Sequence, residues 1–433
     1  MKVKDIIDQF IAGDWGEETC SNETPCAVTC VRGADIIPIS EYNFSAIPIR
    51  YITQQSYLKN RLQVGDIIIE KSGGSPTQST GRVSFVSQEL LDSVGSVVCS
   101  NFCTAFRVKK GWNPLYVYYY FQFIYNLGLF FNFEGKTSGL KNLQLDAAFA
   151  AIPIDDVSES TQNKIVAVLQ GLEKKIALNR QINQNLEAMA KQLYDYWFVQ
   201  FDFPNEEGKP YKSSGGKMIW NEKLKREIPN GWNNCTLQEF LTIKNGRDHK
   251  HLATGSHPVY GSGGEMRRVN EYLFSGESVL MPRKGTLNNI MYVNESFWTV
   301  DTMFYSEMKI VHSAKYVFFA IKDIDFTKWN SGTGLPSMTA STLYNISMIK
   351  PSDDLLKRFN DVLIPVFYKI KQTKDECEKL IRQRDELLPL LMNGQVSVNS
   401  DLSVCINLII RTTTRICSYP NDLFWSYLRI VFL

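Results

Sequence analysis

GDIII at residues 65–69, followed by KSGG at 71–74, decides the fold because the same plan occurs a second time in the chain. GESVL at 276–280 is followed by RKGT at 283–286. Each copy has a glycine-acid pair, an apolar strand-like run and a basic, glycine-rich loop. Self-similarity over such a distance indicates two copies of one domain.

Two further motifs keep the same order after each of these loops. YVYY at 116–119 corresponds to YVFF at 316–319, and GKTSGL at 135–140 corresponds to SGTGL at 331–335. A strand-like segment and a helix-capping Asp or Ser close each copy. The chain therefore reads as domain, helix, domain, helix.

The aromatic run at 115–133 has the length of a membrane span. The second copy of this run contains Lys322, Asp323 and Asp325, charges that a span would not tolerate. We therefore expect both runs to form half-buried helices inside water-soluble domains.

Composition limits the class of protein. A length of 433 residues indicates two or more domains, and a net charge of +2 excludes a protein that holds DNA by overall basicity. Nine cysteines without a CxxC pair, behind a start that is no signal peptide, indicate a reduced, cytoplasmic chain. A metal at Cys20, Cys26 and Cys30 is an alternative, but free thiols are favoured because zinc sites usually show two close pairs.

A long helix is predicted after each domain, with a seam of residues spaced by three and four positions as in a coiled coil. The predicted seam comprises Ile165, Val168, Leu172, Ile176, Asn179, Leu186, Leu193, Phe359, Val362, Val366, Ile370, Leu380 and Leu387. Either helix alone could pack on its own domain. Two similar stripes favour packing of the helices against each other.

The predicted fold class is α+β, with two mixed α/β domains, two long coiled-coil helices and a pseudo-two-fold internal repeat. The stretch at 205–217 is rich in Gly, Lys, Ser and Glu and is predicted to be a linker or an exposed turn, and the linker segment is placed at 201–225. The predicted segments are a first domain at 1–155, a helix at 158–200, the linker at 201–225, a second domain at 226–350, a helix at 352–393 and an atypical tail at 394–433.

An enzyme is the main alternative. NPLY at 113–116 resembles the motif with which amino-methyltransferases hold a flipped adenine, and NSGTG at 330–334 resembles a cofactor turn. A cofactor turn should close a strand and open a helix early in the chain, and it should not be duplicated. An N6-adenine DNA methyltransferase or fused modification enzyme is thus kept only as the alternative. The pair His249 and His251 could bind a metal or act as a base, but the two other histidines, His257 and His312, form no acid-flanked constellation with it, which favours DNA contact or an ordinary exposed loop.

The chain resembles the specificity subunits of type I restriction-modification systems over roughly residues 1–395. The resemblance is carried by KNGRDHKH at 244–251, PVYGSGG at 258–264, LEAMAKQLYDYWF at 186–198 and FDFP at 201–204. It implies two target-recognition domains, each reading half of a split DNA site, separated by two antiparallel helices. It also implies two modification subunits, which methylate adenine with S-adenosylmethionine, and restriction subunits bound through them, which use ATP and magnesium. No catalytic residue, metal or cofactor is expected on this chain, and no membrane.

Base readout needs polar side chains on loops, and phosphate contact needs Lys, Arg and glycine-rich turns. In the first domain these criteria select Lys71, Ser72, Gly73, Gly74, Ser75, Thr77, Gln78, Arg82, Lys136, Thr137, Ser138, Lys141 and Asn142. In the second domain they select Arg247, His249, Lys250, His251, Tyr260, Ser262, Arg267, Arg268, Arg283, Lys284, Thr286, Asn288, Asn289, Ser331 and Thr333.

The tail departs from the family pattern, because such chains normally stop near residue 394. An out-of-frame or recombined extension of the gene is the favoured explanation, and an added docking peptide is the alternative.

Overall fold

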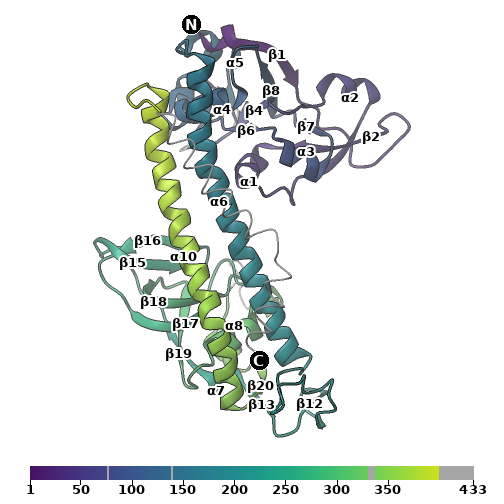
Figure 1. Ribbon diagram of the computed structural model, residues 1–433, viewed down its shortest axis with the longest axis vertical. Coiled ribbons are helices and arrows are strands. Elements are labelled where there is room, and N and C mark those ends of the chain that lie inside the picture. The colour runs from purple at the N-terminus through teal and green to yellow at the C-terminus, as the bar shows by residue number, and fades with distance from the viewer. Residues whose placement is uncertain (76–77, 138–139, 330–336, 399–433) are drawn as a thin grey trace. The chain divides into compact units, whose positions relative to one another are not determined.

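The computed structural model describes residues 1–75, 78–137, 140–329 and 337–398 (Figure 1). The described chain divides into two compact units, one made of residues 1–181 and 374–398 and the other of residues 182–373. Each unit holds one domain of mixed helices and strands and a part of both long helices. The predicted α+β class with a repeated domain is confirmed.

Among the described residues, the first domain carries two sheets with central apolar strands and a third, small sheet that is described with the site. The orders of the first two are β1 (Ile7–Ala12), β8 (Cys103–Val108), β4 (Ile67–Glu70), β6 (Val83–Phe85), and β3 (Ile49–Ile52), β2 (Cys26–Val31), β7 (Val97–Cys99). Ile67, Ile68 and Ile69 are all fully buried. A short continuous apolar run therefore marks a strand covered on both faces, as its sequence indicates.

The second domain has the same topology in one sheet. Its order is β14 (Leu241–Asn245), β19 (Met303–Met308), β17 (Phe274–Pro282), β18 (Met291–Thr299), β15 (Thr254–Gly261), β16 (Gly264–Val269). β18 pairs antiparallel with β17 and parallel with β15, whereas in the first domain β6 makes the antiparallel pair and β7 the parallel one. The helix α3 (Gln88–Val94) separates β6 from β7, so the first domain differs by an insertion into one strand.

The aromatic runs form α4 (Pro114–Asn126) and α8 (Ala314–Lys322), and one expectation about them is wrong. Every residue from Tyr116 to Phe121 is buried, so α4 is not half-buried. Phe121 packs on Phe106 of the sheet at 5.0 Å between ring centroids, and the Tyr119 hydroxyl donates to Glu173 of the first long helix at 2.7 Å. The sheet covers one side of α4 and the long helix covers the other. Among the described helices, none is long and apolar enough to cross a membrane.

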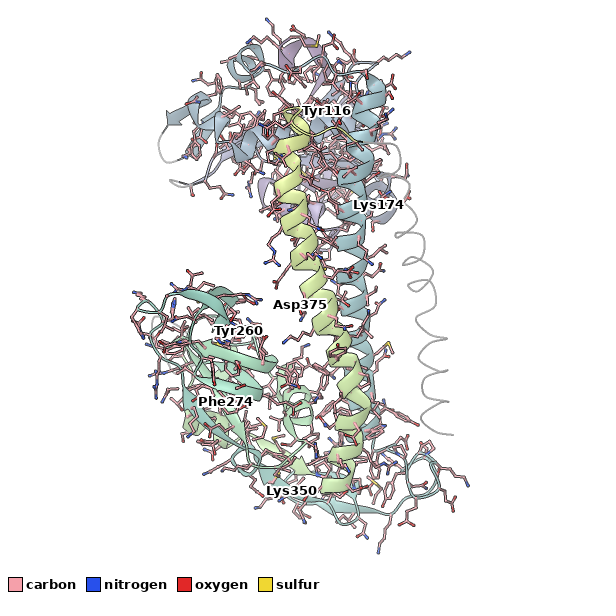
Figure 2. The ribbon with its side chains drawn as sticks, turned by 60° about the vertical axis from the view of Figure 1, so that its left-hand side comes forward. Tyr116, Lys174, Tyr260, Phe274, Lys350 and Asp375 are labelled. Atoms are coloured by element: carbon pink, nitrogen blue, oxygen red, sulfur yellow. The ribbon has the colours of Figure 1, made fainter. Side chains whose placement is uncertain are left out.

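The two long helices are α6 (Glu159–Tyr194), which continues as a π-helical turn (Asp195–Val199), and α10 (Asp353–Met392). In the first unit, Leu169 near the start of α6 shares a core with Leu388 near the end of α10. Further along, the Asn179 amide donates to Glu376 at 2.8 Å, and the Cys377 thiol donates to the Ile176 carbonyl at 3.8 Å. The paired segments of this unit therefore run antiparallel (Figure 2 marks Lys174 on α6 and Asp375 on α10).

In the second unit, the end of α6 and the start of α10 join the core of the second domain. Phe198 meets Phe359 edge to face at 4.9 Å, and Leu193 and Leu356 lie in the same cluster. The ends of both helices thus pack on a domain and on each other at once. All predicted seam residues are buried or partly buried, with Leu172, Leu186, Val362, Val366, Leu380 and Leu387 the partly buried ones.

The stretch at 201–225 is not a free linker. Phe201 is buried, and Phe203 stacks on Tyr211 at 4.7 Å and on Trp232 at 5.1 Å. β11 (Met218–Asn221) then pairs with β12 (Arg226–Pro229). Two apolar side chains, Phe201 and Phe203, thus hold this polar segment on the second domain. The average composition of the segment does not reveal them.

A buried ion pair links α8 to its surroundings in the second unit. Lys315 is 1% exposed; its ammonium donates to Glu277 of β17 and, at 2.7 Å, to Asn360 of α10. Burial raises the pKa of Glu277, but the hydrogen bonds from Lys315 and Tyr292 outweigh it and lower that pKa overall. The carboxylate is therefore held ionised.

We expect Lys315→Met to destabilise the second domain by about 1–3 kcal/mol, because it leaves the partly buried carboxylate of Glu277 without its counterion. A lowered pKa means that the stabilisation from Glu277 is present above the ordinary Glu value of about 4.3 and is lost as the pH falls through the lowered value. Urea unfolding followed by tryptophan fluorescence between pH 3 and 7 measures both effects.

Lys244→Met is the matched control, because Lys244 forms an exposed pair with Glu307 at 3.6 Å. It should cost less than about 1 kcal/mol. Equal losses in the two variants would contradict the structural role of Lys315.

Candidate nucleic-acid interface

The turn that joins β7 to β8, residues 100–102 (SNF), collects the loops of the first domain; we call it the first turn. The amides of Lys71 and Ser72, which follow β4, both donate to the carbonyl of its last residue at 3.0 Å. The amide of its first residue donates to the carbonyl of Val31 at the end of β2, at 2.9 Å. Backbone hydrogen bonds thus tie the ends of β2 and β4 to one point.

The turn that joins β18 to β19, residues 300–302 (VDT), does the same in the second domain; we call it the second turn. The amides of Arg283 and Lys284 donate to the carbonyl of its last residue, at 2.8 and 3.2 Å. The amide of its first residue donates to the Tyr260 carbonyl at 3.0 Å. The repeat therefore extends to individual hydrogen bonds.

A glycine makes the closest approach to each turn. Gly13 follows β1, and Gly246 follows β14. A Cβ atom at Gly13 would lie 2.0 Å from the Ser100 carbonyl oxygen, and one at Gly246 would lie 2.0 Å from the Val300 oxygen. Only glycine fits at these positions, because any side chain would collide with backbone.

The first turn lies at the end of its sheet that is remote from the start of α6. At the opposite end of the first domain, Val3 donates to the Ile152 carbonyl at 3.1 Å just before α6 begins. At the same end, the backbone amide of Asn113 donates to the side chain of Gln162 in α6 at 2.7 Å, and the Asn113 side chain caps α4. The NPLY motif thus serves as a helix cap.

In the first domain, a small sheet brings together predicted residues that lie about 65 positions apart in the chain. β10 (Leu140–Leu143) pairs with β5 (Ser72–Gly73) and with β9 (Glu134–Thr137), which places Lys141 opposite Gly73 and Asn142 opposite Ser72. The backbones of Lys136 and Thr137 lie in β9, and Gly74, Ser75 and Gln78 continue the loop after β5. Thr77 and Ser138 lie outside the described residues.

Two predicted DNA-contacting cations of the first domain are engaged within the fold. Arg82 binds buried Glu70 through two hydrogen bonds of 2.9 and 2.6 Å, which raises the pKa of its guanidinium. Lys141 pairs with Glu134 at 3.0 Å. The structure therefore gives Arg82 a structural role, because releasing it would leave a buried carboxylate unpaired.

In the second domain, three predicted loops lie around the second turn. The Asn289 amide donates to the Ser262 carbonyl at 2.9 Å, joining the loop after β17 to the turn between β15 and β16. Lys284 and Thr286 in the first of these loops are exposed. Arg247 follows Gly246, and its amide donates to the Thr299 carbonyl at 2.8 Å; Lys250 and His251 are exposed in the same loop.

Other predicted residues of the second domain bind to the protein itself. The Tyr260 hydroxyl (Figure 2) donates to Glu295 at 2.8 Å, and Glu295 also binds Lys371 of α10 at 3.0 Å. Burial, and then Glu295, raises the pKa of Tyr260. The remaining members with internal partners are Arg267 on the Leu252 carbonyl, Arg268 on Glu265 and Asn288 on Asp325. Ser331 and Thr333 lie outside the described residues.

The cations that remain available lie mostly in the second domain. Among the described residues, Arg247, Lys250, Arg283 and Lys284 have no ion-pair partner. In the first domain, Lys71 likewise has no ion-pair partner among the described residues. Among the predicted cations whose side chains the structure describes, more are therefore left without an ion pair in the loops at the second turn than in those at the first.

Metal sites at the cysteines or at His249 and His251 are the alternatives. In the described part of the chain, no three His, Cys, Asp or Glu side chains lie close enough together to hold a metal ion. Burial raises the pKa of the Cys30 thiol to about 12, which disfavours the thiolate that binds a metal. The three thiols have different surroundings. Cys20 is exposed, the Cys26 thiol donates to Gln54, and the Cys30 thiol donates to the Asp14 carbonyl. The Nδ1 atom of His249 is buried and has no hydrogen-bond partner among the described residues.

Sequence reasoning missed the turns themselves. Asn101 and Phe102 are exposed at the first turn, and Asp301 is exposed at the second. Their contacts are made through backbone groups, which leave no side-chain signature. A usable signal is the constant offset of 200 residues between the two aromatic runs, which also aligns the two turns.

Comparison with known proteins identifies the repeated domain. Residues 36–188 and 229–378, more than half of the chain, match the family described as Type I restriction modification DNA specificity domain. The chain is 25% identical over 270 residues to the Type I restriction enzyme MjaIX specificity subunit of Methanocaldococcus jannaschii, a match spanning 56% of this chain and 60% of that protein. It is 21% identical over 339 residues to the Type I restriction enzyme HindI specificity subunit of Haemophilus influenzae, spanning 61% and 73%.

A solved structure shares the fold. It is the crystal structure of a type I restriction-modification system S subunit from M. genitalium, with a TM-score of 0.54 and 16% identity over 90% of this chain and 95% of that one. Neither the family match nor these relatives support the methyltransferase alternative. With two matched copies of the domain in one chain, this protein belongs to the family of type I restriction-modification specificity subunits.

Proposed function

We propose that this chain recognises a two-part DNA target, with one half read by the loops at each turn, and directs a methyltransferase and a restriction enzyme to it. The main support is the repeated arrangement at the two turns. Equivalent backbone hydrogen bonds bring polar and basic loops together in both domains. Phosphate contacts position a protein on DNA, and loop side chains that reach base edges supply sequence specificity.

The proposed partners are double-stranded DNA, two modification subunits and, through them, restriction subunits, acting in the cytoplasm. S-adenosylmethionine, ATP and magnesium would bind to those partners, and this chain would carry no catalysis. The curated relatives are named specificity subunits, which supports the division of labour. In the second unit, α10 exposes Ile364 and Tyr368 four positions apart, which offers an apolar strip for a partner.

Neutralising the basic face of the second domain should weaken DNA binding in a salt-dependent way. In the complex with modification subunits, Arg247→Ala combined with Lys284→Ala should lower affinity for specific and non-specific DNA alike. The slope of log K against log salt should fall by about 2, because each phosphate contact contributes about 0.9. Fluorescence anisotropy over a salt series measures this slope.

Lys223→Ala combined with Lys225→Ala removes the same charge from the exposed turn between β11 and β12. This control should leave the slope unchanged. An unchanged slope in the Arg247 and Lys284 variant would show that these loops do not face DNA phosphates.

Exchange of one domain should change one half of the target. Replacing residues 1–155 with the corresponding domain of another family member should alter a single half-site, because each sheet carries its own turn and loops. Sequencing of methylated positions in cells that express the hybrid complex measures the result. A simultaneous change in both halves would contradict independent reading by the two domains.

A further inference from the structure

The two turns present chemically related side chains at equivalent positions. Matching hydrogen bonds align Ser100 with Val300, and β-sheet register aligns Cys103 with Met303. Asn101 therefore corresponds to Asp301, and both are exposed. Each carries an oxygen acceptor within its loop cluster, but asparagine is neutral and also carries a donor amide, whereas the carboxylate is negatively charged and only accepts.

Asp301 is an acidic residue among basic loops. It follows Val300 in a turn whose carbonyl binds the amides of Arg283 and Lys284, and the Arg247 amide binds the residue just before the turn. Yet in the described part of the chain its carboxylate has neither an ion pair nor a hydrogen bond. A carboxylate repels phosphate, so on a DNA-binding face it is suited to a contact with a base.

The bases limit what such a carboxylate can bind. In the major groove the exposed donors are the amino groups of cytosine and adenine, and the usual acceptor for the cytosine amino group is Asp or Glu. Asparagine, with both a donor and an acceptor, pairs with the two groups that adenine presents. The two turn residues thus match two different bases.

The backbone around these side chains is fixed, as base readout requires. Each turn is held by hydrogen bonds from two neighbouring loops, and by a glycine whose closest approach is to the carbonyl of the first turn residue. A side chain on such a support has only its own rotamers to order when it meets a base, which reduces the entropic cost of contact.

We propose that Asp301 reads a cytosine in the half-site of the second domain and that Asn101 reads an adenine in the half-site of the first. This inference rests on the proposed function and names the residues that determine specificity within it. Neither residue acts on phosphate, and each affects only the half-site of its own domain.

The test uses the full chain in complex with modification subunits and a DNA library randomised at both half-sites. Asp301→Asn should change the preferred base from cytosine to adenine at one position of the second half-site, and Asp301→Ala should relax it there by about tenfold or more. Asn101→Asp should produce the opposite change, from adenine to cytosine, at one position of the first half-site. Sequencing of the bound fraction gives the base frequencies.

Glu307→Gln is the matched control, because Glu307 is an acid in β19 near the end remote from the turn. It should leave all base frequencies unchanged, and thermal melting should show that every variant is folded. The inference is overturned if the Asp301 and Asn101 variants keep the wild-type frequencies, or if either changes both half-sites equally. A wild-type complex without any two-part preference would instead overturn the proposed function.

Discussion

Backbone hydrogen bonds at the first and second turns are the constraint on which the reading faces depend. At each turn, amides from the loop after the central strand converge on one carbonyl, and a glycine passes against another carbonyl of the same turn. These bonds involve no side chain, so the loops keep their arrangement while their side chains change. The same frame therefore supports two different sets of loop residues, basic in the second domain and largely internally paired in the first.

Much of the architecture could be predicted because it rests on patterns that survive divergence. The runs at 65–69 and 276–280 both became central strands, and the residues after them, Lys71 and Arg283, occupy equivalent places at the turns. The prediction for α4 was less complete. Periodicity shows which face of a helix is apolar, but it does not show that Glu173 of a distant helix covers the other face.

The site could be predicted only at the level of loops. Residue type predicts Arg82 as a DNA contact. In the structure its guanidinium pairs with Glu70 of a neighbouring strand, and no local sequence pattern reveals this pair. Conversely, Asn101 and Asp301 have no motif around them, and the role proposed for them rests on the convergence of strands that are far apart in sequence. The stretch at 201–225 holds the exposed turns that its composition predicts, but it is not a free linker, since Phe201 is buried and Phe203 stacks on Trp232 beyond the segment.

The shared cores of the helix ends have a consequence for the order in which the protein is made. The core of the first unit includes Leu388, Leu391 and Met392 together with Ile165 and Leu169. A ribosome working from the first residue completes the sheet of this unit long before it releases the last turns of α10. During that interval, while the whole second domain is synthesised, the start of α6 lacks the apolar residues of α10 that complete its core. Such transiently exposed surface is where multidomain chains aggregate or recruit chaperones. Final closure of the first unit is therefore one of the last events of folding, although its sheet is the first to be synthesised.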